Sequence, residues 1–261
     1  MVPEQSYKID ASTEKVFKTS LKNQCLYLND ELIHEHCTSY GFYHEFLLFT
    51  CASTGMYDKL YTLNLHLNTW LHESDSRKSE TIASIMEELE TQKSLSFRWV
   101  ERGAQIVCCS TNRVIFQLPR GNLETILPKA ITINLARKQF NRGNFKDAFE
   151  TIRTHKLDLN LLYDIDPAMF EENAEAILTG IGKVDYINLF VTQMKDSLSD
   201  ELQYCLPSQR IEEIENYHKI KIEGQKVKLV CGIVSKTLRA LDKEKFILSI
   251  FTSDIKMGLL N

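Results

Sequence analysis

The spacing of apolar residues changes around residues 118–126, LPRGNLETI, and this change restricts the fold more than any other feature. Upstream of it, apolar and polar residues alternate as in β-strands. Downstream, apolar residues recur every three or four positions, as in α-helices. The Arg-Gly-Asn at its centre is compatible with a phosphate-binding loop, a plain turn or a junction between two architectures. We therefore expect two regions, residues 1–122 and 123–261.

Residues 1–122 are expected to hold several short strands. The run EFLLFTCAS from residue 45 predicts a buried strand, although its length alone does not exclude a piece of helix. The run YTLNLHL, residues 61–67, predicts a half-buried strand. In YTLNLHL the core side would carry Tyr61, Leu63, Leu65 and Leu67, and the water side Thr62, Asn64 and His66. The stretch AQIVCCSTNRVIFQLP, residues 104–119, predicts a β-hairpin with its turn at residues 110–113.

The spacing of these strands is typical of a sandwich, a barrel or a propeller. Polar residues 72–94 between them predict a surface loop with one short helix. A stretch of about 120 residues supplies at most about three propeller blades, each of roughly 40 residues. A propeller built from this region alone could not close.

Residues 123–261 predict about six helices of similar length. The first has Pro128 at its start, Arg142 and Gly143 at its end, and an apolar stripe of Ile131, Leu135, Ala136 and Phe140. The second starts at Asn144 and carries Phe145, Ala148, Phe149 and Ile152; the third starts at Asp166 and Pro167, carries Phe170, Ala174, Ile177, Leu178 and Ile181, and ends at Gly182. The remaining apolar stripes run from Tyr186 to Met194, from Val227 to Leu241 and from Phe246 to Phe251. Residues 195–225 are polar and poorly periodic. Helices paired by short turns predict an α-solenoid of helical hairpins.

Composition and charge exclude several classes of protein. With 43% hydrophobic and 25% charged residues and a net charge of −4, the chain is typical of soluble globular proteins and lacks a basic face that would bind nucleic acid unaided. The first residues do not predict a signal peptide, and there is no long apolar run, so we expect no membrane span and an intracellular protein. Seven cysteines without a C-x-x-C pair favour reduced thiols.

No pattern predicts a catalytic, cofactor-binding or metal site. The sequence HEHC holds His34, His36 and Cys37, but no second ligand pair follows at zinc spacing, so a structural role is favoured. Adjacent Cys108 and Cys109 should face opposite sides of a strand. Signatures of hydrolases, phosphate-binding loops and zinc proteases are absent.

Two polar stretches in the second region also have structural interpretations. In YDIDP, Asp166 is expected to cap a helix and Asp164 to form a turn. In ARKQFNRGNFK, the basic residues could contact RNA phosphates, but basic groups in a last helical turn equally complement the helix dipole. These are Arg137, Lys138, Arg142 and Lys146.

Several stretches resemble the family of large scaffold subunits of the Elongator complex, elongator complex protein 1. PRGNLE at residues 119–124 and LNLLYD at residues 159–164 carry the likeness, together with FKDAFETIRTHKLDL and VDYINLF. It extends more weakly over EFLLFT and KVKLVCGIVSKTLRAL, from about residue 11 to 252. Residues 195–224 depart from the family pattern, and the family's proteins are several times longer.

The resemblance implies an incomplete, WD40-like β-propeller in residues 1–122, followed by an α-solenoid in residues 123–261. It implies a non-catalytic scaffold without cofactor or metal, in a complex that modifies the wobble uridine of transfer RNA. The expected partners are other Elongator subunits, with transfer RNA reached indirectly. The dimerisation region of the family would be absent, and the location would be the cytoplasm or the nucleus.

A coat or trafficking adaptor is the alternative, because propeller-solenoid architecture also serves membrane coats. An independent RNA-binding module is a third class, which the mild acidity disfavours. For LPRGNLETI, the junction is favoured over a phosphate loop: Pro119 would end the last strand, Gly121 and Asn122 would turn the chain, and Arg120 would contact both strands and helices.

Overall fold

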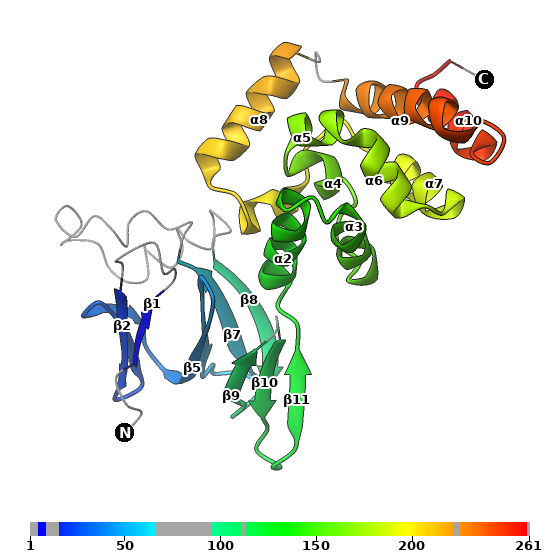
Figure 1. Cartoon of the computed structure of the whole chain (residues 1–261). Helices are drawn as coiled ribbons and strands as arrows, with labels where there is room; N and C mark the ends of the chain where they lie inside the picture. Colours follow the sequence, from blue (N-terminus) through cyan, green and yellow to red (C-terminus); the bar gives the residue numbers. More distant parts are fainter. Residues whose placement is uncertain (1–4, 9–15, 66–94, 111–112, 222–224, 260–261) are drawn as a thin grey trace. The chain divides into compact units, whose positions relative to one another are not determined.

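The computed structural model describes residues 5–8, 16–65, 95–110, 113–221 and 225–259 (Figure 1). The chain folds as two compact units, Met1–Ile131 and Thr132–Asn261. The first is built of antiparallel strands and the second of helices, which confirms the expected fold class. The compact units divide after Ile131, whereas the sequence placed the domain boundary after residue 122.

In the residues that the structure describes, the strand unit consists of three open antiparallel sheets, and in each the strands pair in the order of the chain. The first sheet holds β1 (Gln5–Lys8), β2 (Val16–Lys22), β3 (Cys25–Leu28) and β4 (Glu31–His34). The second holds β5 (Cys37–Tyr43), β6 (Phe46–Cys51), β7 (Tyr57–Asn64) and β8 (Leu95–Glu101), and the third holds β9 (Gln105–Ser110), β10 (Arg113–Gln117) and β11 (Leu123–Ile126). Successive small meanders of this kind are what an incomplete propeller requires.

The second sheet has packed side chains on both faces. One face meets the first sheet in a core of large apolar residues, which includes Leu26, Leu28, Ile33, Leu47, Phe49, Tyr61, Leu63 and Leu95. On the other face, β9 of the third sheet lies against β5, where the Ile106 N–H donates to Ser39 Oγ at 2.8 Å. A Cβ added to Gly41 would lie 2.9 Å from Cys109 Sγ. Gly41 thus permits the close approach of these two sheets.

The buried strand expected from residue 45 is β6, whose six residues are all buried. The half-buried interpretation of YTLNLHL is wrong, because Thr62 and Asn64 of β7 are buried as well. Thr62 pairs with Leu48, and Leu48 with Gly41, so Thr62 lies on the same face of the second sheet as Gly41, where β5 meets β9. His66 and Leu67 lie outside the described residues, as does the loop expected at 72–94.

The hairpin predicted from AQIVCCSTNRVIFQLP is confirmed as β9 and β10, although its turn residues 111–112 are outside the described ranges. Pro119 does not end the last strand, because β11 follows and pairs antiparallel with β10. The Gly121 N–H donates to the Leu118 carbonyl at 2.8 Å, and Gly121 has a φ of 84°, which favours glycine. LPRGNLETI therefore turns between two strands, and the change to helix comes at Pro128.

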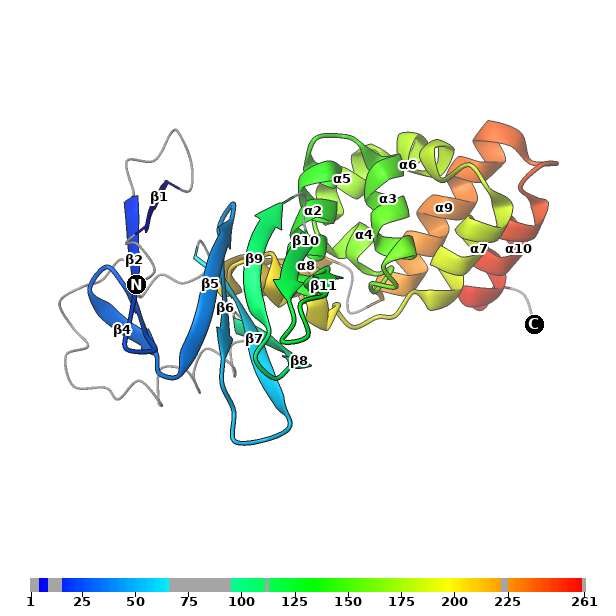
Figure 2. The ribbon, with the colours of Figure 1, turned by 90° about the horizontal axis from the view of Figure 1, so that it is seen from below.

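The helical unit contains α2 (Lys129–Asn141), α3 (Phe145–Thr154), α4 (Leu161–Asp164), α5 (Pro167–Glu172), α6 (Ala174–Ile181), α7 (Val184–Gln193), the 3₁₀ helix η2 (Asp200–Tyr204), α8 (Ser208–Lys221), α9 (Lys226–Asp242) and α10 (Ile247–Lys256). Helices α3, α6 and α9 pack successively in one layer, and α7 and α10 pack together in a second (Figure 2). Because α6 and α9 connect to α7 and α10 through short turns, the arrangement is a solenoid of helical hairpins.

Local signals set several of these helix ends. The Asp166 carboxylate accepts the Met169 N–H at 3.1 Å and Pro167 occupies the first turn of α5, as the sequence predicted. Gly182, with a φ of 67°, ends α6. The single helix expected between these two residues is divided at Asn173 into α5 and α6. Helix α8 was not expected, because its sequence is polar with little periodicity.

Asp164 is not a turn residue, as the sequence suggested, but a fully buried carboxylate at the end of α4. It accepts hydrogen bonds from Lys226 Nζ at 3.0 Å and from the Ser199 N–H at 2.9 Å. Lys226 also donates to the Ser197 carbonyl at 2.6 Å. This network fastens the aperiodic segment before η2 to α4 and α9, and it satisfies backbone groups that no helix pairs.

Candidate functional site

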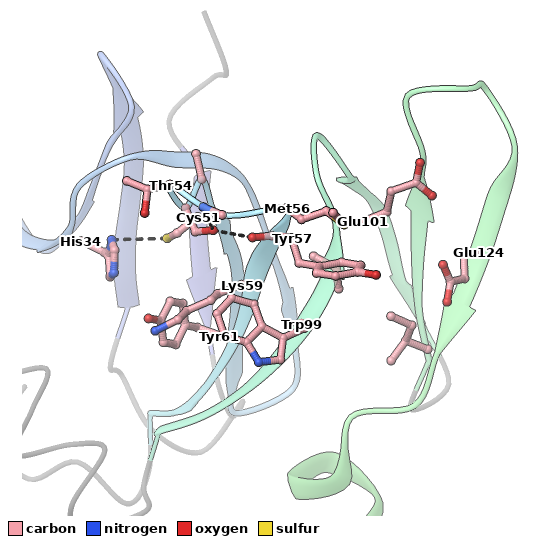
Figure 3. A pocket seen from close by; sticks show the side chains of 15 residues that line it. His34, Cys51, Thr54, Met56, Tyr57, Lys59, Tyr61, Trp99, Glu101 and Glu124 are labelled. Atoms are coloured by element: carbon pink, nitrogen blue, oxygen red, sulfur yellow. Dashed lines mark hydrogen bonds between the residues drawn. The ribbon is translucent and has the colours of Figure 1, made fainter.

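A groove with a volume of about 980 Å³ opens in the strand unit (Figure 3). Its walls come from all three sheets and from the turn between β6 and β7. The lining residues are His34, Cys51, Ala52, Ser53, Thr54, Gly55, Met56, Tyr57, Lys59, Tyr61, Trp99, Val100, Glu101, Glu124 and Ile126. In size it matches ordinary ligand sites.

Asp58 fixes the turns beside the groove. This carboxylate is buried, and its two oxygens accept the Ser53 N–H at 3.1 Å and the Gly103 N–H at 2.8 Å. It therefore joins the β6–β7 turn to the β8–β9 turn, which lies far along the chain. Because both bonds are to a charged acceptor, they hold the turns more firmly than neutral hydrogen bonds would.

Aromatic rings surround the Lys59 ammonium group on one wall. Lys59 Nζ lies 4.7 Å from the ring centroid of Phe97 and 5.6 Å from those of Tyr61 and Trp99. The Trp99 side chain is 54% exposed. Cation–π contacts of this kind hold the lysine over the strands and leave a flat aromatic surface facing solvent.

A thiol and imidazole cluster lies on another wall of the groove. Cys51 Sγ is 3.1 Å from Cys37 Sγ. It is also 3.3 Å from His34 Nδ1, and a dashed line marks this contact in Figure 3. The hydrogen bond with Cys37, opposed by burial and aided by His34, lowers the pKa of Cys51 to about 6. The same bond, with burial, raises the pKa of Cys37 far above its usual range. Burial lowers the pKa of His34, but the hydrogen bond and charge of Cys51 more than offset it and raise that pKa.

Only part of this cluster was visible in the sequence. Within HEHC, His34 ends β4 and Cys37 begins β5, while exposed His36 has a φ of 60° in the turn between them. Cys51 was not anticipated as a third member, because it becomes a neighbour of Cys37 only through the pairing of β5 with β6. A correct prediction of the register between β5 and β6 would have placed Cys51 opposite Cys37.

Cys108, Cys109 and the basic residues singled out in the sequence are not among the residues that line this groove. Cys108 is exposed on β9, and neighbouring Cys109 is half-buried, as expected for adjacent strand residues. Arg120 is 83% exposed, and its Nε lies 3.6 Å from Glu101 Oε1, so the recorded ion pair joins it to β8 rather than to a helix. Arg142 and Lys146 are exposed on the helical unit, while Arg137 donates to Asn134 Oδ1 at 3.1 Å.

Helix α10 presents an unusual face to solvent. Its exposed apolar residues are Ile247, Leu248, Phe251 and Ile255, which fall within one arc of about 100° on the helix. Its inner face carries Ile250 together with buried Ser249, Ser253 and Asp254. Asp254 accepts hydrogen bonds from Ser235 Oγ at 2.8 Å and Arg239 Nη2 at 2.6 Å. The outer face is thus more apolar than the packed one, which is typical of a protein-contact surface.

The helices that the structure describes include none with both the length and the hydropathy of a membrane span.

Residues 129–259 match the family described as ELP1 alpha-solenoid, a range that runs from the start of α2 to just beyond the end of α10. Putative elongator complex protein 1 of Xenopus laevis is 34% identical over 88% of this chain and 18% of the relative. The elongator complex protein 1 of Mus musculus is 30% identical over 90% of this chain and 17% of its own length. That of Saccharomyces cerevisiae is 30% identical over 93% and 18%. The chain spans less than a fifth of these relatives.

Proposed function

The chain belongs to the elongator complex protein 1 family, and from this premise we propose that it is a non-catalytic scaffold segment that binds other subunits of an Elongator complex. The relatives that carry the name of that complex align with nearly the whole of this chain. A solenoid supports such a role because each hairpin adds surface without requiring a catalytic centre.

The apolar outer face of α10 is the structural observation that carries this proposal. Leu248 and Phe251 are 63% and 49% exposed, although both are residues that a folded chain normally buries. The inner face of the helix is held by Asp254 and its partners on α9, so α10 keeps its orientation without burying the outer stripe. We assign this stripe to contact with another protein chain of the complex.

The link to transfer RNA is part of the same proposal, and it is indirect. A net charge of −4 does not favour strong binding of a polyanion by this chain alone. The scaffold would therefore support wobble-uridine modification by holding other subunits together, in the cytoplasm or the nucleus. Salt-sensitive binding of transfer RNA by the isolated chain would contradict this indirect role.

The proposal is tested by affinity purification of the tagged chain from cells that contain Elongator. We expect the wild type to recover other Elongator subunits. The double variant Leu248→Glu, Phe251→Glu should recover at least about tenfold less of them, because it places two charges in an apolar contact. Val107→Glu is the matched control, since Val107 is 57% exposed on β9 of the strand unit. Equal recovery of subunits by both variants would show that the outer face of α10 is not the contact surface. Recovery of vesicle-coat proteins by a folded wild-type chain would overturn the Elongator assignment itself.

A further inference from the structure

We propose that His34, Cys37 and Cys51 form a Zn²⁺ site on the wall of the groove in the strand unit. Nothing in the family relationship supplies this site, and the sequence favoured a structural role for His34 and Cys37. The proposal does not depend on the Elongator assignment, because it concerns only the strand unit.

Strand pairing brings the three ligands together. Cys37 and Cys51 are opposite residues of the antiparallel strands β5 and β6, and His34 ends the preceding strand β4. The three ligand atoms all lie within 4.8 Å of one another. In a tetrahedral zinc site, with bonds of about 2.3 Å to sulfur and about 2.0 Å to nitrogen, neighbouring ligand atoms are about 3.5–3.8 Å apart. These separations therefore need to change by no more than about 1.3 Å to admit the ion.

The chemistry of the ligands selects the metal. Two thiolates and one imidazole suit zinc, whereas Ca²⁺ and Mg²⁺ require sets of oxygen ligands. Binding would release the protons of the two thiols, so that both sulfurs carry the negative charge that the ion neutralises.

The surroundings orient the imidazole. Its ring centroid lies 5.2 Å from that of Tyr61 and 5.9 Å from that of Phe49, both buried rings of the second sheet. Nδ1 faces Cys51 Sγ and also contacts the Glu35 carbonyl oxygen. Coordination through Nδ1 replaces that backbone contact, because a nitrogen bound to zinc cannot also donate a proton.

Three protein ligands leave a fourth position for a group from the groove. His34 and Cys51 both line the groove, whereas Cys37 is buried behind them. The fourth ligand is therefore water or a donor atom of a molecule that occupies the groove. A disulfide between the two cysteines would use only two of the three groups and would give the imidazole no role.

The test measures zinc in the full chain, purified under reducing conditions from zinc-supplemented medium. We expect about one zinc per chain in the wild type and at least about tenfold weaker retention in Cys51→Ser and in His34→Gln. Cys108→Ser is the matched control, because Cys108 is an exposed thiol on β9, and it should retain zinc like the wild type. Replacement of zinc by Co²⁺ should produce sulfur-to-cobalt charge-transfer absorption in the wild type and the control alone.

Alkylation of the wild-type chain keeps the test decisive even where a variant unfolds. Added zinc should slow the alkylation of Cys51 at least about tenfold and leave that of Cys108 unchanged. A wild-type chain that neither retains zinc nor gains this protection would overturn the proposal. Retention unchanged in both ligand variants, or a Cys37–Cys51 disulfide formed in preference to zinc binding, would overturn it as well.

Discussion

Lys226 Nζ lies 3.0 Å from Asp164 Oδ1, and neither side chain has any exposed surface. The two residues join the end of α4 to the start of α9. Burial, the largest effect, raises the pKa of Asp164 to about 6, and the charge of Lys226 opposes that rise only in part. The pair therefore sets which segments meet in the helical unit and contributes less to stability than its short distance suggests.

Breaking this pair from one side should be more harmful than removing it entirely. Lys226→Met leaves the Asp164 carboxylate buried without a counter-charge and should lower the free energy of unfolding by about 3–5 kcal/mol. The double variant Asp164→Leu, Lys226→Met should lose clearly less. Urea denaturation measures both. Equal losses in the single and double variants would show that the pair itself is strongly stabilising.

Protonation of His218 should oppose folding of the helical unit at acidic pH. Its side chain is buried, its Nε2 is without a hydrogen-bond partner in the described part of the chain, and burial, followed by the charge of Lys226, lowers its pKa to about 4. Between about pH 6.5, the ordinary pKa of histidine, and about pH 4, the unfolded chain binds a proton at His218 that the folded chain does not bind. This group therefore removes up to about 3 kcal/mol of stability as the pH falls.

The variant His218→Phe keeps a ring beside Tyr163 and removes this titration. Asp164 has the opposite effect on stability, because its raised pKa makes the folded chain bind the extra proton below about pH 6. This effect is the same in the wild type and the variant, so it cancels when the two are compared. The difference in unfolding free energy between the two proteins should thus grow in favour of the variant from pH 7 to about pH 4. Urea denaturation across this range measures it, and a constant difference would contradict the assignment.

Gly41→Val should separate the second and third sheets. A Cβ at this position would lie 2.9 Å from Cys109 Sγ and 3.3 Å from Ile106 Cγ2, so the larger side chain must push β9 away from β5, at about 1–3 kcal/mol. Gly55→Val is the control, since its nearest neighbour would be Ser53 Oγ at 3.6 Å. Thermal unfolding compares them, and similar melting temperatures would show that the sheets tolerate the added volume.

The same substitution should cost much more stability on the buried face of α10 than on its exposed face. Phe251→Glu places a charge on the exposed face and should change the unfolding free energy by less than about 0.5 kcal/mol. Ile250→Glu, one residue earlier, places it in the buried face and should cost several times more, about 3 kcal/mol or above. Chemical denaturation of both proteins is sufficient. Comparable losses would mean that Phe251 is packed within the chain.

The sequence alone was sufficient for those features that depend on neighbouring residues. Asp166 and Pro167 start α5 and Gly182 ends α6, because a cap, a fixed φ and a left-handed φ act within one helical turn. Patterns with a period of two and of about 3.6 residues likewise separated strands from helices, and the resemblance in residues 119–124 and 159–164 indicated the family. These signals are local, so they are present before any tertiary contact forms.

Only the tertiary structure decided which polar groups are buried and which distant residues meet. Thr62 and Asn64 were expected to face water, yet both side chains are buried in the folded chain. Cys51 joins Cys37 through strand register, and Asp164 meets Lys226 across 62 positions of the chain. Each of these contacts is set by the packing of elements far apart in sequence, and no local spacing encodes such packing.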